Sequence, residues 1–154
     1  MALGKILLKV TKIFFLVTIV LLVVIILFLH FFFSGLCGND FLDSKISPDE
    51  KSKIVIFLRN CGATTDFSVQ ASIVSNDFRL NDNSTGNLFT ADSNDGTVTQ
   101  ANNIGGPRIT SEWVGTSTLQ IQYAHGARFF KQERRYQGVN ILYSELPLTL
   151  KYSY

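Results

Sequence analysis

Residues 13–33 form a long apolar run without a charged residue other than His30 when protonated, and this run constrains the fold more than any other feature of the chain. Only Thr18 and His30 are polar within it. At about 1.5 Å of rise per residue, a helix of this length spans roughly 30 Å, the thickness of the hydrocarbon core of a bilayer. Because the run is apolar on every side of such a helix, it lacks the polar face of a helix on a soluble domain. We therefore predict a transmembrane helix over residues 13–34, with the lipid bilayer as its partner.

The charges before the run predict its orientation. Lys5, Lys9 and Lys12 precede the run, and no acidic residue does. Positive flanks stay on the cytoplasmic side, so residues 1–12 are expected in the cytoplasm and the remainder outside. A cleaved signal peptide is the alternative, although its apolar region is usually shorter and ends in small residues. A lipoprotein signal is a second alternative, because Ser34-Gly35-Leu36-Cys37 loosely matches one. We favour a retained signal anchor.

The chain after the run is nearly neutral. All twelve acidic residues lie there, from Asp40 onward, against eleven of the fourteen basic residues. The basic isoelectric point therefore reflects the anchor and gives no reason to expect nucleic-acid binding. The length that remains, about 115 to 120 residues, suits one domain. We expect a linker and turn over residues 35–52, which are polar and contain Pro48, and a β-rich domain over residues 53–154.

Short segments with a two-residue period predict that this domain is all-β. In residues 119–123, apolar Leu119, Ile121 and Tyr123 alternate with two glutamines, as in a strand with one buried face. Similar segments at intervals of about 8 to 12 residues predict an antiparallel sheet or a small sandwich. The expected strands are 53–59, 66–74, 108–114, 119–123, 127–133, 139–143 and, at the edge, 148–152, with shorter ones near Leu88-Phe89 and Val98.

Residues 75–107 are rich in asparagine, aspartate, serine and glycine, and we expect long loops there, of the kind that bind ligands or move. The spacing of Asn81, Asn83, Thr85, Gly86 and Asp92 approaches that of a calcium loop. Its first three ligands would be neutral, however, and no helix precedes it. We favour Asx-type turns here and in the segment that begins at Asp92.

The two cysteines, Cys37 and Cys61, both follow the run and so face an oxidising compartment under the predicted topology. A disulfide between them is the favoured interpretation, and closing that loop stabilises the domain by about 3.5 kcal/mol. Free or intermolecular thiols are an alternative. Catalysis by Cys61 with His125 as its base is another, although no third residue that would orient the base can be recognised. After the run the chain has two cysteines and one histidine, which are too few for a closed zinc site without carboxylates.

Arg128, Lys131, Arg134 and Arg135 form a basic cluster. Such a cluster can bind an acidic partner or anionic lipid, or it can simply keep the end of a hairpin soluble. Aromatic residues are a second candidate surface, because they can line a groove, although alternating aromatics more often form a core. They are Trp113, Tyr123, Phe129, Phe130, Tyr136 and Tyr143.

Two short stretches, Ser47-Pro48-Asp49-Glu50-Lys51 and Arg59-Asn60-Cys61-Gly62-Ala63-Thr64-Thr65, resemble an uncharacterised family of small bacterial envelope proteins. Its members carry an N-terminal hydrophobic segment, a Cys-Gly-Asn like that at Cys37, an S-P-D-G-K turn and a D-C-G-A-T-T run. Glu50 replaces the glycine and Asn60 the aspartate, which puts the conformation of the turn in doubt. The resemblance implies a bacterial inner (plasma) membrane location, a periplasmic or extracellular domain and the cysteine pair, but no reaction.

The chain offers no constellation of nucleophile, base and stabiliser, and we expect neither an enzyme nor a cofactor. The favoured function is a membrane-anchored extracytoplasmic protein-interaction module with a partner as yet unknown, in one version an immunity protein that guards its cell against a toxin. The alternative is a ligand- or ion-sensing domain that uses the loops of residues 75–107.

Overall fold

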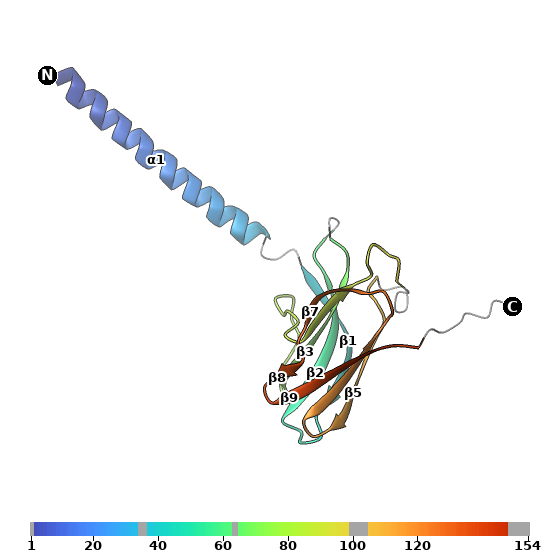
Figure 1. Ribbon diagram of the computed structural model, residues 1–154. Coiled ribbons are helices and arrows are strands. Elements are labelled where there is room, and N and C mark those ends of the chain that lie inside the picture. Colours follow the sequence, from blue (N-terminus) through green and yellow to red (C-terminus); the bar gives the residue numbers. More distant parts are fainter. Residues whose placement is uncertain (1, 34–36, 63–64, 99–104, 148–154) are drawn as a thin grey trace. The chain divides into compact units, whose positions relative to one another are not determined.

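The computed structural model describes residues 2–33, 37–62, 65–98 and 105–147 (Figure 1). The chain forms two compact units, Met1–Leu36 and Cys37–Tyr154. The first consists of the helix α1 (Ala2–Phe33) and the second is built from strands.

The helix α1 contains the apolar run. Within it, Leu8–Leu29 is a candidate membrane span of 22 residues with a mean hydropathy of 3.2. The polar Thr18 donates its hydroxyl hydrogen to the carbonyl oxygen of Phe14 (2.9 Å), so this group needs no partner outside the helix. A signal sequence near the N-terminus can also be this long and this apolar, so α1 is a candidate for either a membrane anchor or a signal sequence. The predicted end of the span at residue 34 lies outside the described residues.

The second unit is all-β, as predicted. Its strands form a five-stranded sheet in the order β1-β2-β3-β4-β7 and a four-stranded sheet in the order β5-β6-β9-β8 (Figure 1). The predicted edge strand at residues 148–152 lies outside the described residues, and Val98 lies in a turn. The strands are β1 (Gly38–Ile46), β2 (Ser52–Asn60), β3 (Ser68–Ser75), β4 (Phe89–Asp92), β5 (Ile109–Gly115), β6 (Thr118–Tyr123), β7 (Arg128–Gln132), β8 (Arg135–Tyr136) and β9 (Val139–Glu145).

The expected linker over residues 35–52 is wrong, because β1 occupies most of it. This strand pairs antiparallel with β2 from Gly38 opposite Asn60 to Ile46 opposite Lys53. It is an edge strand and is largely exposed, so polar residues fill it and the alternation that marks the inner strands is missing. Leu42, at a bulge in β1, packs against the core.

The expectation of a purely antiparallel arrangement is wrong at one pair, because β9 lies parallel to β6. Between them the chain enters the other sheet as β7 and returns as β8, which pairs antiparallel with β9. Residues 139–143 alternate regularly, and this pattern predicted the strand correctly. Alternation shows which face of a strand is buried but not the direction of its neighbour.

The hydrophobic core joins the inner faces of the two sheets. Burying each large aliphatic side chain here contributes about 1.5 to 3 kcal/mol. Phe89 is fully buried, and its ring centroid lies 6.0 Å from that of Tyr123, which packs against the core, and 5.7 Å from that of Phe129, which is 39% exposed. Burial raises the pKa of Tyr143, which stays protonated and donates to the carbonyl oxygen of Glu133 (2.8 Å). The buried aliphatic residues include Ile54, Ile56, Leu58, Val69, Ile73, Leu119, Ile121 and Ile141.

Candidate functional site

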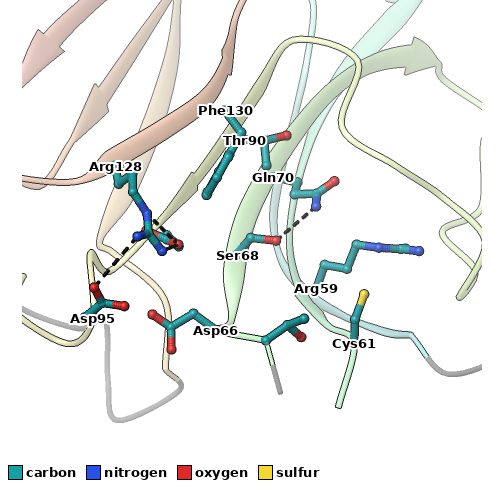
Figure 2. A pocket seen from close by; sticks show the side chains of 11 residues that line it. Arg59, Cys61, Asp66, Ser68, Gln70, Thr90, Asp95, Arg128 and Phe130 are labelled. Atoms are coloured by element: carbon teal, nitrogen blue, oxygen red, sulfur yellow. Dashed lines mark hydrogen bonds and ion pairs between the residues drawn. The ribbon is translucent and has the colours of Figure 1, made fainter. Parts of the chain in front are cut away.

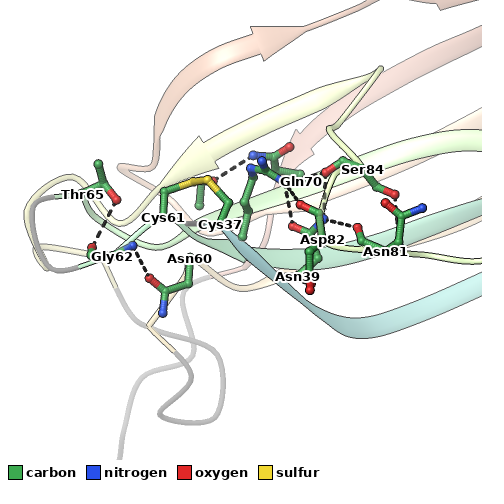
Figure 3. The surroundings of a disulfide bond; sticks show 12 residues. Cys37, Asn39, Asn60, Cys61, Gly62, Thr65, Gln70, Asn81, Asp82 and Ser84 are labelled. Carbon is green, nitrogen blue, oxygen red and sulfur yellow. Dashed lines mark hydrogen bonds between the residues drawn. A yellow bond between two sulfur atoms is a disulfide. The ribbon is translucent and has the colours of Figure 1, made fainter. Parts of the chain in front are cut away.

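A disulfide joins Cys37 to Cys61, with their Cα atoms 3.9 Å apart (Figure 3). The two residues continue the register of the β1–β2 pair, in which Gly38 lies opposite Asn60. The bond therefore holds the first residues of β1 against the end of β2. The favoured disulfide is present, and the alternatives of free thiols or of a nucleophilic Cys61 are wrong, because neither sulfur is free.

Beside the disulfide, Asn39 holds the loop that follows β3 (Figure 3), and Arg59 bonds to the same loop. Nη1 of Arg59 donates to the carbonyl oxygen of Ser84 (2.7 Å) and to Oδ1 of Asn39 (3.1 Å). Nδ2 of Asn39 donates to the carbonyl oxygens of Asn81 (2.7 Å) and Ser84 (2.8 Å). These bonds fix the loop on the outer face of the five-stranded sheet.

The same loop is bonded to β3 further along. The backbone nitrogen of Gly86 donates to Oε1 of Gln70 (2.6 Å), and the backbone nitrogen of Asn87 donates to Oγ of Ser72 (3.0 Å). A Cβ added to Gly86 would lie 2.6 Å from the carbonyl oxygen of Phe89, so only glycine permits this approach. Residues 81–87 are therefore held on the sheet by hydrogen bonds and do not form an open loop.

The predicted Asx turns are confirmed at both places. Oδ1 of Asn81 accepts from the backbone nitrogen of Asn83 (2.9 Å), and Oδ1 of Asp92 accepts from that of Asn94 (2.9 Å). A calcium loop would use each of these oxygens as a ligand. Here each oxygen accepts the hydrogen bond that closes its turn.

A pocket of about 600 Å³ lies on the outer face of the five-stranded sheet, beside the disulfide (Figure 2). Its floor consists of polar side chains from β3 and β4, where Gln70 lies opposite Thr90 and Ser68 lies opposite Asp92. Nε2 of Gln70 donates to Oγ of Ser68 (3.0 Å). The remaining lining residues are Arg59, Cys61, Thr65, Asp66, Asp95, Arg128 and Phe130.

An ion pair forms one wall of this pocket. Nε of Arg128, on β7, lies 3.1 Å from both carboxylate oxygens of Asp92, whose side chain is only 4% exposed. Nη1 of Arg128 lies 3.8 Å from Oδ2 of Asp95. The negative charge of Asp66 also favours the protonated guanidinium group. The hydrogen bond to Asp92, more than the neighbouring charges, raises the pKa of Arg128. A bidentate contact of this kind also fixes the orientation of the guanidinium group.

Phe130, beside Arg128 on β7, also lines the pocket and is 63% exposed. It is the extra residue of a bulge, because Thr90 pairs with Lys131 and the next residue, Ala91, pairs with Phe129. Bulges re-aim side chains, and here the bulge places Phe130 on the pocket side of β7. The guanidinium carbon of Arg128 lies 5.5 Å from the centre of the Phe130 ring.

The structure divides the predicted basic cluster. Arg128 is held by Asp92, and Nζ of Lys131 donates to the carbonyl oxygen of Gly86 (3.2 Å). Arg134 and Arg135 are exposed, and neither side chain has a hydrogen bond or ion pair within the described part of the chain. We call these two residues the basic tip. Of the four residues of the predicted cluster, the two of the basic tip are therefore the ones whose charges have no described partner.

A second cavity, of about 720 Å³, lies at the opposite end of the domain, among the turns that join β1 to β2, β5 to β6 and β8 to β9. Trp113 and Tyr136, two of the aromatics considered for a groove, line it. Nε1 of Trp113 donates to the carbonyl oxygen of Lys45 (3.0 Å). His125, considered as a catalytic base, has its Nδ1 2.7 Å from Oε2 of Glu145, and both side chains are exposed.

Sequence reasoning missed the pocket floor. Ser68, Gln70, Thr90 and Asp66 were considered only as strand or turn residues. A signal was present in β3, where Val69, Ala71 and Ile73 alternate with Ser68, Gln70 and Ser72, so one face is consistently polar. That these residues meet β7 across β4 follows from the sheet order, which the sequence does not reveal.

The fold and site define a chain with one N-terminal apolar helix followed by a disulfide-bonded β-domain that carries a polar pocket. It belongs to a family of unknown function, DUF5412, whose model matches residues 5–99. The expectation of an uncharacterised family is thereby confirmed. The match covers the helix, the disulfide and the pocket floor but ends before Arg128 and Phe130. No curated protein and no solved structure matches the chain.

Proposed function

We propose that this protein is a single-pass membrane-anchored protein of the bacterial envelope whose β-domain is a protein-interaction module outside the membrane. The observation that carries the proposal is the disulfide between Cys37 and Cys61, in a domain that follows a helix of spanning length. Disulfides persist in oxidising compartments and are rare in the cytoplasm. The lysines before the apolar run favour the same orientation. An immunity protein is one version of this function.

We also propose that the domain is not an enzyme. The nucleophile that the sequence suggested, Cys61, is bonded to Cys37. His125 is engaged with Glu145 at the surface. Within the described residues, no group of three or more His, Cys, Asp or Glu side chains could hold a metal ion. These observations leave binding as the activity that the described side chains support best.

The basic tip is the surface we propose for the partner protein. Arg134 and Arg135 are exposed and carry charges that no described acidic residue neutralises. They lie where the chain passes from β7 in one sheet to β8 in the other. Arginine is favoured at interfaces because its planar group binds carboxylates in a bidentate manner. The partner therefore carries an acidic patch.

A photo-crosslinking residue placed at Glu133, beside the basic tip, tests this proposal in intact cells. We expect a discrete adduct that disappears in the double variant Arg134→Glu/Arg135→Glu. The matched control is Arg79→Glu/Arg108→Glu, which makes the same change in net charge at two other exposed arginines. No adduct in the unaltered background, or an adduct that both double variants retain, would contradict the proposal.

Ligand binding is a second candidate function, and the pocket beside the disulfide favours it. Its volume of about 600 Å³ lies within the roughly 300 to 1,000 Å³ typical of small-molecule sites. The loops of residues 75–107 contribute Asp95 to its rim and hold Gln70 in its floor. A shift in melting temperature with ligand tests this function, because a ligand that binds only the folded state stabilises it.

A further inference from the structure

The floor of the pocket beside the disulfide presents uncharged hydrogen-bonding groups in fixed positions. The amide of Gln70 is oriented at both ends, because Oε1 accepts from Gly86 and Nε2 donates to Ser68. One N–H of Gln70 and the hydroxyl hydrogen of Ser68 remain available. The hydroxyl of Thr90 makes no hydrogen bond within the described part of the chain. The floor can therefore both donate to and accept from a ligand without rearranging.

Both guanidinium groups beside this floor are already engaged within the protein. Arg128 is bound to Asp92 by two of its nitrogens and lies near Asp95. Arg59 is bound through Nη1 to Asn39 and to the carbonyl oxygens of Asp82 and Ser84. An anionic ligand would have to compete with carboxylates for Arg128 and with amide and carbonyl oxygens for Arg59, and a cation would have to compete with Arg128. The pocket therefore favours a ligand that is polar but uncharged.

Phe130 adds an apolar face to this polar site. Figure 2 shows its ring directed into the pocket, near Thr90 and the Gln70–Ser68 pair. A phenylalanine that is 63% exposed keeps most of its hydrophobic surface in water, so covering it would be favourable. The contact with Arg128 limits the orientations of the ring. The site thus combines an aromatic wall with a floor of hydroxyl and amide groups.

A pyranose ring matches both surfaces, because it has a face of C–H groups and a rim of hydroxyls. We propose that the pocket binds a neutral saccharide unit, with Phe130 stacked on the sugar face and Ser68, Gln70 and Thr90 bonded to its hydroxyls. Asp66, exposed at the open side, accepts from a further hydroxyl. This rests on the proposed function, since a domain outside the membrane meets glycans of the envelope.

Saturation-transfer NMR on the purified full-length chain tests the proposal, in a detergent without a sugar headgroup. The probes are maltose, cellobiose and the disaccharide of N-acetylglucosamine. We expect at least one to bind, and Phe130→Ala to weaken it about tenfold through loss of the aromatic contact. Thr90→Val, which keeps the shape and removes the hydroxyl, is expected to weaken it about fivefold. Unchanged melting temperatures would confirm that both variants fold.

Phe41→Ala is the matched control, because Phe41 lies on β1 of the same sheet and is 59% exposed. It should leave saccharide binding unchanged. No binding of any of the three probes would overturn the proposal, and so would binding that Phe130→Ala and Phe41→Ala weaken equally. Binding of trilysine or inorganic phosphate in place of the sugars would also overturn it. Absence of the crosslinked adduct in the unaltered chain is a separate result, obtained in cells. A failure of the proposed partner surface can therefore be told apart from a failure of saccharide binding.

Discussion

Glu50 has a backbone conformation that favours glycine, with φ of 59°. It lies in the turn between β1 and β2, where its backbone nitrogen donates to the carbonyl oxygen of Ser47 (2.9 Å). Glycine adopts such a φ without strain, whereas the side chain of Glu50 disfavours it.

We predict that Glu50→Gly stabilises the domain by about 1 kcal/mol, because a side chain in the left-handed region costs roughly 1 to 2 kcal/mol. Thermal unfolding of the full-length chain should show a melting temperature about 3 to 6 °C higher. The control is Glu112→Gly, at an exposed position inside β5, which should lower the melting temperature instead. A decrease with Glu50→Gly would contradict the account of this turn.

Asp49, in the same turn, gives the domain a pH dependence. Oγ of Ser47 donates to its Oδ1 (2.7 Å), and this bond, followed by one from the backbone of Lys51 (3.3 Å), lowers the pKa of Asp49. A carboxyl whose pKa is lower in the folded state stabilises that state above its unfolded pKa of about 3.9, and this stabilisation is lost as the pH falls through the folded pKa.

The stability difference between the natural chain and Asp49→Asn should therefore be present at neutral pH and close below about pH 4. Denaturant titrations of both chains at a series of pH values measure it. A difference for Asp49→Asn that is constant from neutral to acidic pH would show that its charge does not act in the turn.

At the scale of the strands, the sequence reveals some elements and conceals others. The strands β6 and β9 were predicted because apolar residues alternate with polar ones in both. The structure buries three of these apolar residues, Leu119, Ile121 and Ile141. β1 was missed because an edge strand needs few apolar residues, and Leu42 reaches the core through a bulge that breaks the alternation. The parallel contact of β6 with β9 depends on a crossing between sheets, which leaves no local signal.

The candidate site was predictable only in part, for the same reason. The disulfide followed from the number of cysteines and the expected compartment. The pocket depends on the pairing of β4 with β7, which brings Phe130 to the polar face of β3 and β4. Neither that order nor the bulge at Phe130 can be read from the residues alone. The basic cluster was recognised as a group, but its division depends on the burial of Asp92.

The disulfide should stabilise β1 more than any other strand. It closes a loop between residues separated by 24 positions, and loss of such a loop closure is worth about 3.5 kcal/mol. In Cys37→Ser/Cys61→Ser, we expect faster hydrogen exchange in β1 and in the loop that Asn39 holds, because β1 pairs with β2 alone within its sheet. β3 and β6 should stay protected.

Hydrogen exchange followed by mass spectrometry measures this strand by strand. The paired control is Ser44→Ala/Ser75→Ala, two exposed positions without the covalent link. Exchange that rises equally in β1, β3 and β6 would indicate that the disulfide supports the domain as a whole. An unchanged rate in β1 would contradict the view that it holds this edge.

For the molecule as a whole, the proposed functions depend on the side of the membrane on which the β-domain lies. The distribution of charge supports the outside, since basic residues precede the apolar run and all acidic residues follow it. A disulfide-bonded domain, a partner protein at the basic tip and a saccharide in the pocket all require that side. Retention of α1 as an anchor requires in addition that the chain is not cleaved.

Labelling of intact cells with a membrane-impermeant thiol reagent, with and without prior reduction, tests whether the β-domain lies outside the membrane. The readout is the mass of the full-length protein. The account predicts that an uncleaved chain takes up two labels after reduction and none before it, because Cys37 and Cys61 are bonded and face outward. Labels that appear only after lysis would place the domain in the cytoplasm and contradict the account.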